Sequence, residues 1–200
     1  RAPHIYIAAP TRFVRDRGDA PGYDKKDVNA TDILFMTTRA GSVKYDRVFT
    51  EAFIRPGLDT ESWRNRSNYA ALNVVPTGPN EVSIYHRSGD RYVLRTDGFV
   101  SVHAGSQTGE LITRPLIFSG EELHLNLSTS AVGLVQVEVR DESGKPISGF
   151  TLDDCPVVYG DGIDLIVKWK NDRNLSSLAG KPVRLRFVMK ECDLFSFQFE

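Results

Sequence analysis

The sequence predicts an all-β protein, in which antiparallel β-meanders resembling propeller blades are followed by a β-sandwich. Two observations support this fold class. Apolar and polar residues alternate with a period of two in many short segments, whereas no window of useful length shows the 3.6-residue period of an amphipathic helix. Each alternating segment is also bounded by residues that favour turns, chiefly glycine, proline, aspartate and serine. Short antiparallel strands with one side toward solvent produce this pattern.

The first half of the chain predicts strands that are joined by long polar connections. The two longest connections, 14–31 and 57–67, contain proline, glycine, aspartate and arginine with little apolar content, so we expect loops there. Pairs of the strands between them have the spacing of four-stranded meanders, as in propeller blades. The expected strands are 4–9, 32–38, 45–54, 68–75, 81–86 and 92–96.

The second half has the clearest alternation, and two sheets built from its strands would pack face to face as a β-sandwich. A glycine-containing join at 102–111 separates the two patterns, so we expect one domain at 1–103 and another at 104–200. The residues expected to face the core are Leu123, Leu125, Leu127, Val135, Val137, Val139, Leu165, Val167, Trp169, Val183, Leu185, Phe187, Phe195, Phe197 and Phe199.

Charge and hydropathy exclude several kinds of partner. The chain has 25 Lys and Arg against 26 Asp and Glu, a net charge of −1, so we expect neither nucleic acid nor an anionic membrane surface as a partner. No apolar run approaches the roughly 18 residues of a membrane span. The chain begins at Arg1 beside a predicted strand, without a signal peptide, and we interpret it as part of a longer protein.

The sequence predicts no metal site and no cofactor. The four histidines, His4, His86, His103 and His124, are scattered without the spacing of a zinc site. His124 alternates outward from a leucine-rich strand and is expected to face solvent. The segment 161–164 is interpreted as an Asp-Gly turn, because a Ca²⁺ loop needs more oxygen ligands. Neither a nucleophile elbow nor a phosphate or dinucleotide loop is present.

Neither the paired acids nor the cysteines indicate a reaction. Glycoside hydrolysis needs two carboxyl groups held roughly 5–10 Å apart across the scissile bond. The adjacent pairs 121–122 and 153–154 cannot supply this, because neighbours on a strand point to opposite faces. Cys155 and Cys192 are the only thiols, and they are either two buried free cysteines or a disulfide of a secreted protein.

Several runs of residues resemble the C-terminal region of a group of bacterial proteins similar to glycoside hydrolase family 32. That family has a five-bladed β-propeller followed by a β-sandwich. The runs that carry the resemblance are PTRF at 10–13, EAFIRPG at 51–57, DGFVSV at 97–102, LITRPLIFSGEEL at 111–123, VQVEV at 135–139, VKWK at 167–170 and GKPVRLRF at 180–187.

The resemblance implies the last propeller blades and the sandwich of a carbohydrate-active protein. The catalytic carboxylates of the family come from the first three blades, which would precede Arg1, so no catalytic residue is carried over to this chain. The expected partners are therefore a carbohydrate and an N-terminal segment of the same protein, and activity on carbohydrate would place the protein outside the cytoplasm. The alternative is a carbohydrate-binding or structural β-sandwich module.

Candidate sugar-binding residues lie in the first half. Sugars are held by aromatic faces and by planar polar side chains that hydrogen-bond to their hydroxyl groups. Such side chains occur together at 63–69. In a propeller the start of an innermost strand lines a central funnel, so Asn68 and Tyr69 would lie there if 68–75 is innermost, and two further arginines would point into it. The candidates are Arg12, Arg55, Trp63, Arg66, Asn68 and Tyr69. In the alternative interpretation the aromatic rings pack against the blade and the arginines pair with acids.

Overall fold

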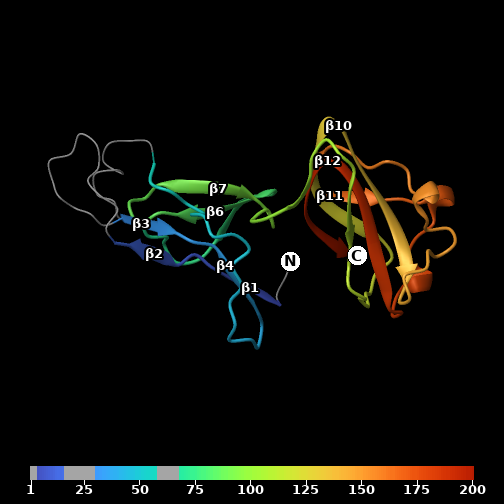
Figure 1. Ribbon diagram of the computed structural model, residues 1–200, viewed down its shortest axis with the longest axis horizontal. Coiled ribbons are helices and arrows are strands. Elements are labelled where there is room, and N and C mark those ends of the chain that lie inside the picture. The colour runs from blue at the N-terminus through green and yellow to red at the C-terminus, as the bar shows by residue number, and fades with distance from the viewer. Residues whose placement is uncertain (1–3, 16–29, 58–67) are drawn as a thin grey trace. The chain divides into compact units, whose positions relative to one another are not determined.

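The computed structural model describes residues 4–15, 30–57 and 68–200 and confirms the predicted all-β class (Figure 1). The strand pairings of these residues with a defined register are antiparallel, and none of the sheets that they form closes on itself. The helical elements of the described chain are single 3₁₀ turns, η1 (Leu152–Asp154), η2 (Lys170–Asp172) and η3 (Ser176–Leu178). The chain divides into two compact units, Arg1–Leu94 and Arg95–Glu200.

The described residues of the first unit form three small sheets. β1 (Ile5–Ala8) pairs with β4 (Met36–Arg39), and β2 (Thr11–Val14) pairs with β3 (Ala30–Ile33). A three-stranded meander consists of β5 (Val75–Gly78), β6 (Glu81–Tyr85) and β7 (Arg91–Arg95). The described apolar residues that this unit buries are few: Ile33, Leu34, Phe35, Ile54 and Ile84.

Three of the strands predicted for the first half differ from the structure. The segment 32–38 is split between β3 and β4, because consecutive Leu34 and Phe35 are both buried and cannot follow a two-residue alternation. The segment 45–54 forms only isolated bridges, at Asp46 and Ile54. The segment 68–75 contributes one bridge, at Ala70, before β5 begins. Irregular connections therefore occupy more of the described part of this unit than the alternation indicated.

The second unit is one five-stranded sheet built around two long strands. β10 (Leu123–Asp141) and β12 (Val183–Phe199) pair from Leu123–Phe199 at one end to Asp141–Val183 at the other. β11 (Asp161–Val167) lies along the free edge of β10. Both β8 (Val102–Ala104) and β9 (Gly109–Ile112) pair with β12, so the residues around the expected domain boundary at 103–104 belong to this sheet.

Most of the alternating residues of the second half fill the core as predicted. Phe195 is an exception: its ring lies under Arg95, and the neighbouring Leu194 is buried in the core instead. Twenty described apolar residues of this unit are buried in one cluster, among them Leu123, Leu125 and Leu127 of β10 with no exposed surface. Trp169 packs edge-on against Phe150 with ring centroids 5.4 Å apart, and its Nε1 donates to the carbonyl oxygen of Val137 at 3.2 Å. Each such apolar side chain contributes about 1.5–3 kcal/mol by leaving water.

The sequence predicts separate strands around 123–128 and 135–140, but both lie within β10. An irregularity in the pairing between Thr129 and Leu134 bends the strand without ending it. Gly133 lies inside this irregularity, where an added Cβ would lie against the backbone oxygen of Glu191 and 2.8 Å from the Cβ of Thr129. The close approach of β10 and β12 at this point therefore requires glycine.

Replacing Gly133 with alanine should lower the free energy of unfolding of the second unit by about 1–3 kcal/mol, because backbone atoms must move to admit the methyl group. Gly105→Ala is the matched control, since nothing lies within 4 Å of a Cβ at that position. Urea denaturation followed by tryptophan fluorescence measures both changes. Equal stabilities for the two variants would contradict this account of the bend.

Candidate functional site

Arg12, a predicted sugar ligand on β2, is held in an ion pair. Its Nε donates to Oδ1 of Asp32 at 2.9 Å, its Nη2 lies 2.5 Å from Oδ2, and its Nη1 donates to the backbone oxygen of Thr50 at 3.0 Å. The hydrogen bond to Asp32 raises the pKa of the Arg12 guanidinium, which is partly opposed by burial. These contacts match the alternative expectation of an arginine paired with an acid.

Asn68 is likewise occupied by the protein. Its residue is 4% exposed, its Nδ2 donates to the backbone oxygen of Thr31 at 2.7 Å, and its backbone N–H donates to Oγ1 of the same threonine at 2.6 Å. Its own backbone oxygen accepts from Oγ1 of Thr11 at 3.0 Å. Asn68 therefore ties β2 and β3 to the chain that leads into the meander.

Of the remaining predicted sugar ligands, the structure describes Arg55 and Tyr69 and places both at the surface. Tyr69 is 40% exposed, and Arg55 is exposed just after the bridge at Ile54. Trp63 and Arg66 lie outside the described residues. Among the described candidates, two have structural contacts and two face solvent.

Replacing Asn68 with alanine should lower the free energy of unfolding of the first unit by about 1–3 kcal/mol, because the side-chain bond to Thr31 is lost from a buried position. Tyr69→Ala, at an exposed neighbouring position, should change it by no more than about 0.5 kcal/mol. Thermal unfolding followed by circular dichroism compares the two. A variant at position 68 that is as stable as the unsubstituted chain would show that the bond contributes nothing.

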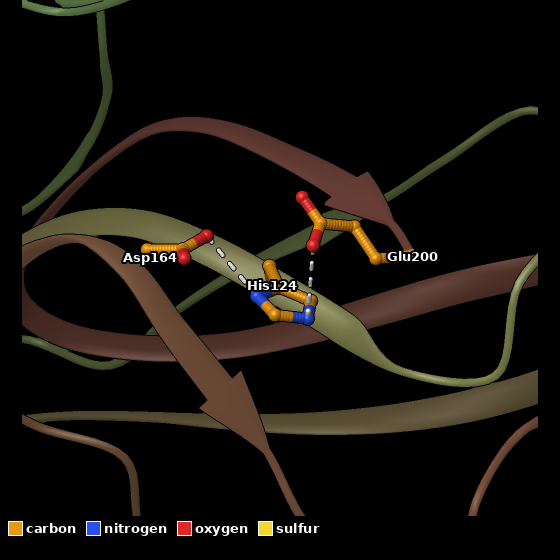
Figure 2. Close-up of side chains that lie close together, drawn as sticks. All are labelled: His124, Asp164 and Glu200. Atoms are coloured by element: carbon orange, nitrogen blue, oxygen red, sulfur yellow. Dashed lines mark hydrogen bonds and ion pairs between the residues drawn. The ribbon is translucent and has the colours of Figure 1, made fainter.

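The second unit contains a cluster of one histidine and three carboxylates that the sequence analysis did not assemble. His124 of β10 lies opposite Ile166 of β11, so Asp164, two residues along β11, points to the same face of the sheet. Glu122 precedes His124 by two residues, and its backbone exchanges hydrogen bonds with that of Glu200. Strand pairing therefore places all four side chains on one face. Figure 2 shows the His124 ring between Asp164 and Glu200.

The His124 ring is enclosed by these acids. Its Nδ1 lies 3.1 Å from Oδ1 of Asp164, in hydrogen-bond geometry, and its Nε2 lies 3.4 Å from Oε2 of Glu122 and 4.0 Å from Oε2 of Glu200. His124 is 6% exposed, so the expectation that it faces solvent is wrong. The side chain does leave the apolar core, as the alternation predicts, but the flanking strands and their acidic side chains cover it.

The same face carries a second group of buried polar side chains further along β10. Asn126 is 2% exposed, and its Nδ2 donates to the backbone oxygen of Thr96 at 2.7 Å. Arg95 pairs with Asp161 at 2.7 Å and lies over the ring of Phe195, 4.5 Å from its centroid. Segment 95–96 therefore covers this part of the sheet, which explains why polar residues of an outward-facing row are buried.

A pocket of about 180 Å³ adjoins the histidine cluster. Its wall includes Glu122, which also faces His124, and its polar lining comes mainly from the chain that follows β11. Its charged and amide-bearing residues include Glu121, Glu122, Lys168, Asp172, Arg173 and Asn174. The dense run of polar residues after Trp169 is the sequence signal from which this pocket could have been predicted.

The two cysteines of the second unit are free and buried. Burial raises the pKa of the Cys192 thiol to about 11, assisted by the neighbouring charge of Asp193. Burial also raises the pKa of Cys155, although a hydrogen bond from the Val137 backbone opposes the shift. The first of the two alternatives, two buried thiols, therefore describes this structure, and both are poor nucleophiles at neutral pH.

Comparisons with protein-family models, with curated proteins and with solved structures found no match to this chain. Within the described residues, no helix is long and apolar enough to cross a membrane.

Proposed function

We propose that this chain is a non-catalytic, C-terminal part of a carbohydrate-active protein similar to glycoside hydrolase family 32. In this proposal the first unit represents the last propeller blades and the second unit the β-sandwich that follows them. The resemblance of the sequence runs supports the family, and the succession of short antiparallel sheets followed by a well-packed antiparallel unit is compatible with it.

The exposure of β1 carries the proposal. Three consecutive large apolar residues, Ile5, Tyr6 and Ile7, are 38%, 56% and 38% exposed, so both faces of this strand meet solvent. Among the described strands β1 pairs only with β4, and a two-stranded sheet is marginally stable by itself. An additional polypeptide segment that supplied the neighbouring blades would cover both the faces and the open edge.

The acids of the first unit support a non-catalytic role. Asp32 is bound by Arg12, and Glu81 is bound by Arg91 with Nη2 and Oε1 2.5 Å apart. These two carboxylates are thus already engaged by guanidinium groups, so their bonded oxygens are not available to a substrate. We therefore assign the glycosidic chemistry of the whole protein to a segment that this chain does not contain.

The purified chain should self-associate and should hydrolyse neither fructosides nor aryl glycosides. Light scattering coupled to size exclusion measures the association, and release of reducing sugar or chromophore measures the hydrolysis. Ile5→Lys combined with Ile7→Lys should weaken association, whereas Ile117→Lys, at a 69% exposed position of the second unit, should not. A monomeric unsubstituted chain, or turnover by it, would contradict the proposal.

The pocket beside β11 favours a second candidate function, that of a carbohydrate-binding module. Its volume suits a single sugar ring, and carboxylate, amide and guanidinium groups around it are the side chains that recognise vicinal hydroxyls.

Asp172→Asn should weaken glycan binding at least about tenfold, because a charged hydrogen-bond acceptor becomes a neutral one. Asparagine tolerates the left-handed conformation of this position, where φ is 49°, so the fold is retained. Asp153→Asn, an exposed aspartate that does not line the pocket, is the matched control. Screening on a glycan array followed by calorimetry makes the measurement. Absence of any glycan ligand, or equal affinity of the two variants, would exclude this second function.

A further inference from the structure

We propose that the second unit binds a divalent transition-metal cation, best matched by Zn²⁺, at the cluster of Glu122, His124, Asp164 and Glu200. In this site Nε2 of His124 and one carboxylate oxygen each from Glu122 and Glu200 coordinate the metal. Asp164 holds the imidazole ring from its other side. The inference is independent of the proposed carbohydrate function.

The unsatisfied nitrogen of His124 is the first observation. The residue is 94% buried, and its Nε2 has no hydrogen-bond partner. A buried polar atom without a partner costs about 1–3 kcal/mol, so such atoms are uncommon and call for a ligand. This nitrogen faces the two glutamates. With the proton on Nδ1, it presents a lone pair to carboxylates that are themselves acceptors and cannot satisfy it. A cation between the three groups removes the conflict.

A ring nitrogen of His124 and one carboxylate oxygen each of Asp164 and Glu200 lie within 4.8 Å of one another. Glu122 is not part of this group, so coordination at Nε2 requires the side chains of Glu122 and Glu200 to move toward the metal. Zinc ligands lie about 2.0–2.2 Å from the metal in a tetrahedral arrangement, which puts neighbouring ligand atoms about 3.4 Å apart. Nε2 of His124 lies 3.4 Å from Oε2 of Glu122 and 4.0 Å from Oε2 of Glu200. The side chains of Glu122 and Glu200 are 48% and 57% exposed, so both are free to move toward a metal bound at Nε2. Water would complete the fourth position.

Asp164 sets the orientation of the ring. Its Oδ1 lies 3.1 Å from Nδ1 of His124, so a proton on Nδ1 donates to this carboxylate and leaves the lone pair on Nε2. A carboxylate that accepts from the second nitrogen of a metal-binding histidine is the usual arrangement in zinc sites, and it increases the basicity of the ligand. Asp164 is therefore a positioning residue.

The backbone holds the two glutamates in place. The N–H groups of Glu121 and Glu122 both donate to the carbonyl oxygen of Glu200, at 2.5 and 2.8 Å, and the N–H of Glu200 donates to the carbonyl of Glu122 at 3.1 Å. The strand pairing that follows, beginning with Leu123 opposite Phe199, extends this frame. The backbone positions of all three ligands are therefore fixed at the end of the β10–β12 pairing, while the two glutamate side chains remain mobile.

The charge of the cluster also favours a cation. Among the ion pairs of the described residues, Glu122, Asp164 and Glu200 each contact only His124. Three carboxylates around one imidazole leave a net negative charge even when the ring is protonated, and like charges at this separation repel one another. A divalent metal offsets this charge and leaves the ring neutral, which is the form that coordinates.

The test is calorimetric titration of the full chain, freed of metal with EDTA, with ZnCl₂. We expect one equivalent of Zn²⁺ to bind more tightly than Ca²⁺ or Mg²⁺, because nitrogen is a poor ligand for the harder cations. Substituting Co²⁺ should give the visible absorption of a tetrahedral site. Absence of stoichiometric Zn²⁺ binding would overturn the proposal and leave His124 with the neighbouring acids as its only partners.

Variants of the exposed acids separate coordination from folding. Glu122→Gln combined with Glu200→Gln should weaken Zn²⁺ binding at least about tenfold while the metal-free chain keeps its circular dichroism spectrum. Asp164→Asn should weaken binding less than the double variant, because it alters only the orientation and basicity of the ring. Glu121→Gln, with the same charge change at the adjacent position, is the control. Equal Zn²⁺ affinity of the control and the double variant would overturn the assignment.

Discussion

The pairing of β10 with β12 is the interaction on which the second unit depends. It fixes which side chains of both strands face the core, because alternation along each strand follows from the register. It also provides the edges to which β11, β8 and β9 are added. The same register sets Glu200 opposite Glu122 and thereby gathers the carboxylates around His124. The core and the candidate metal site therefore both depend on the hydrogen bonds between β10 and β12.

The sequence predicted the all-β class and the apolar side of this sheet because a two-residue alternation is a local property. Leu123, Leu125 and Leu127 are buried as expected. It did not predict that β10 continues through Gly133, because a bulge and a turn use the same residue types and differ only in what lies across the strand. In the first unit, buried Leu34 and Phe35 interrupt the alternation, so the predicted strand at 32–38 was misjudged.

The candidate sites were harder to predict because each depends on residues distant in the chain. The pattern placed His124 outside the core, but only the pairing with β11 and the return of Glu200 show that the ring is enclosed. For Arg12 and Asn68 the residue types agree equally with sugar binding and with internal bonds. Both residues form internal bonds because β3 places Asp32 beside Arg12 and Thr31 beside Asn68. The residue type limits the roles that a side chain can have, and the strand register determines which partner it meets and so which role it has.

The long strands have a consequence for the order in which the second unit forms. Asp141 and Val183 are the paired residues closest in sequence, whereas Leu123 and Phe199 are the most distant, so loop-closure entropy favours pairing from the former end. If strand pairing starts at that end and proceeds along β10 and β12, Glu122 and Glu200 are brought together last. The carboxylate cluster would therefore assemble only after the core has formed, and occupancy of the cluster would report that the chain has finished folding. A ligand bound at the cluster would therefore stabilise the end of the β10–β12 ladder that closes last.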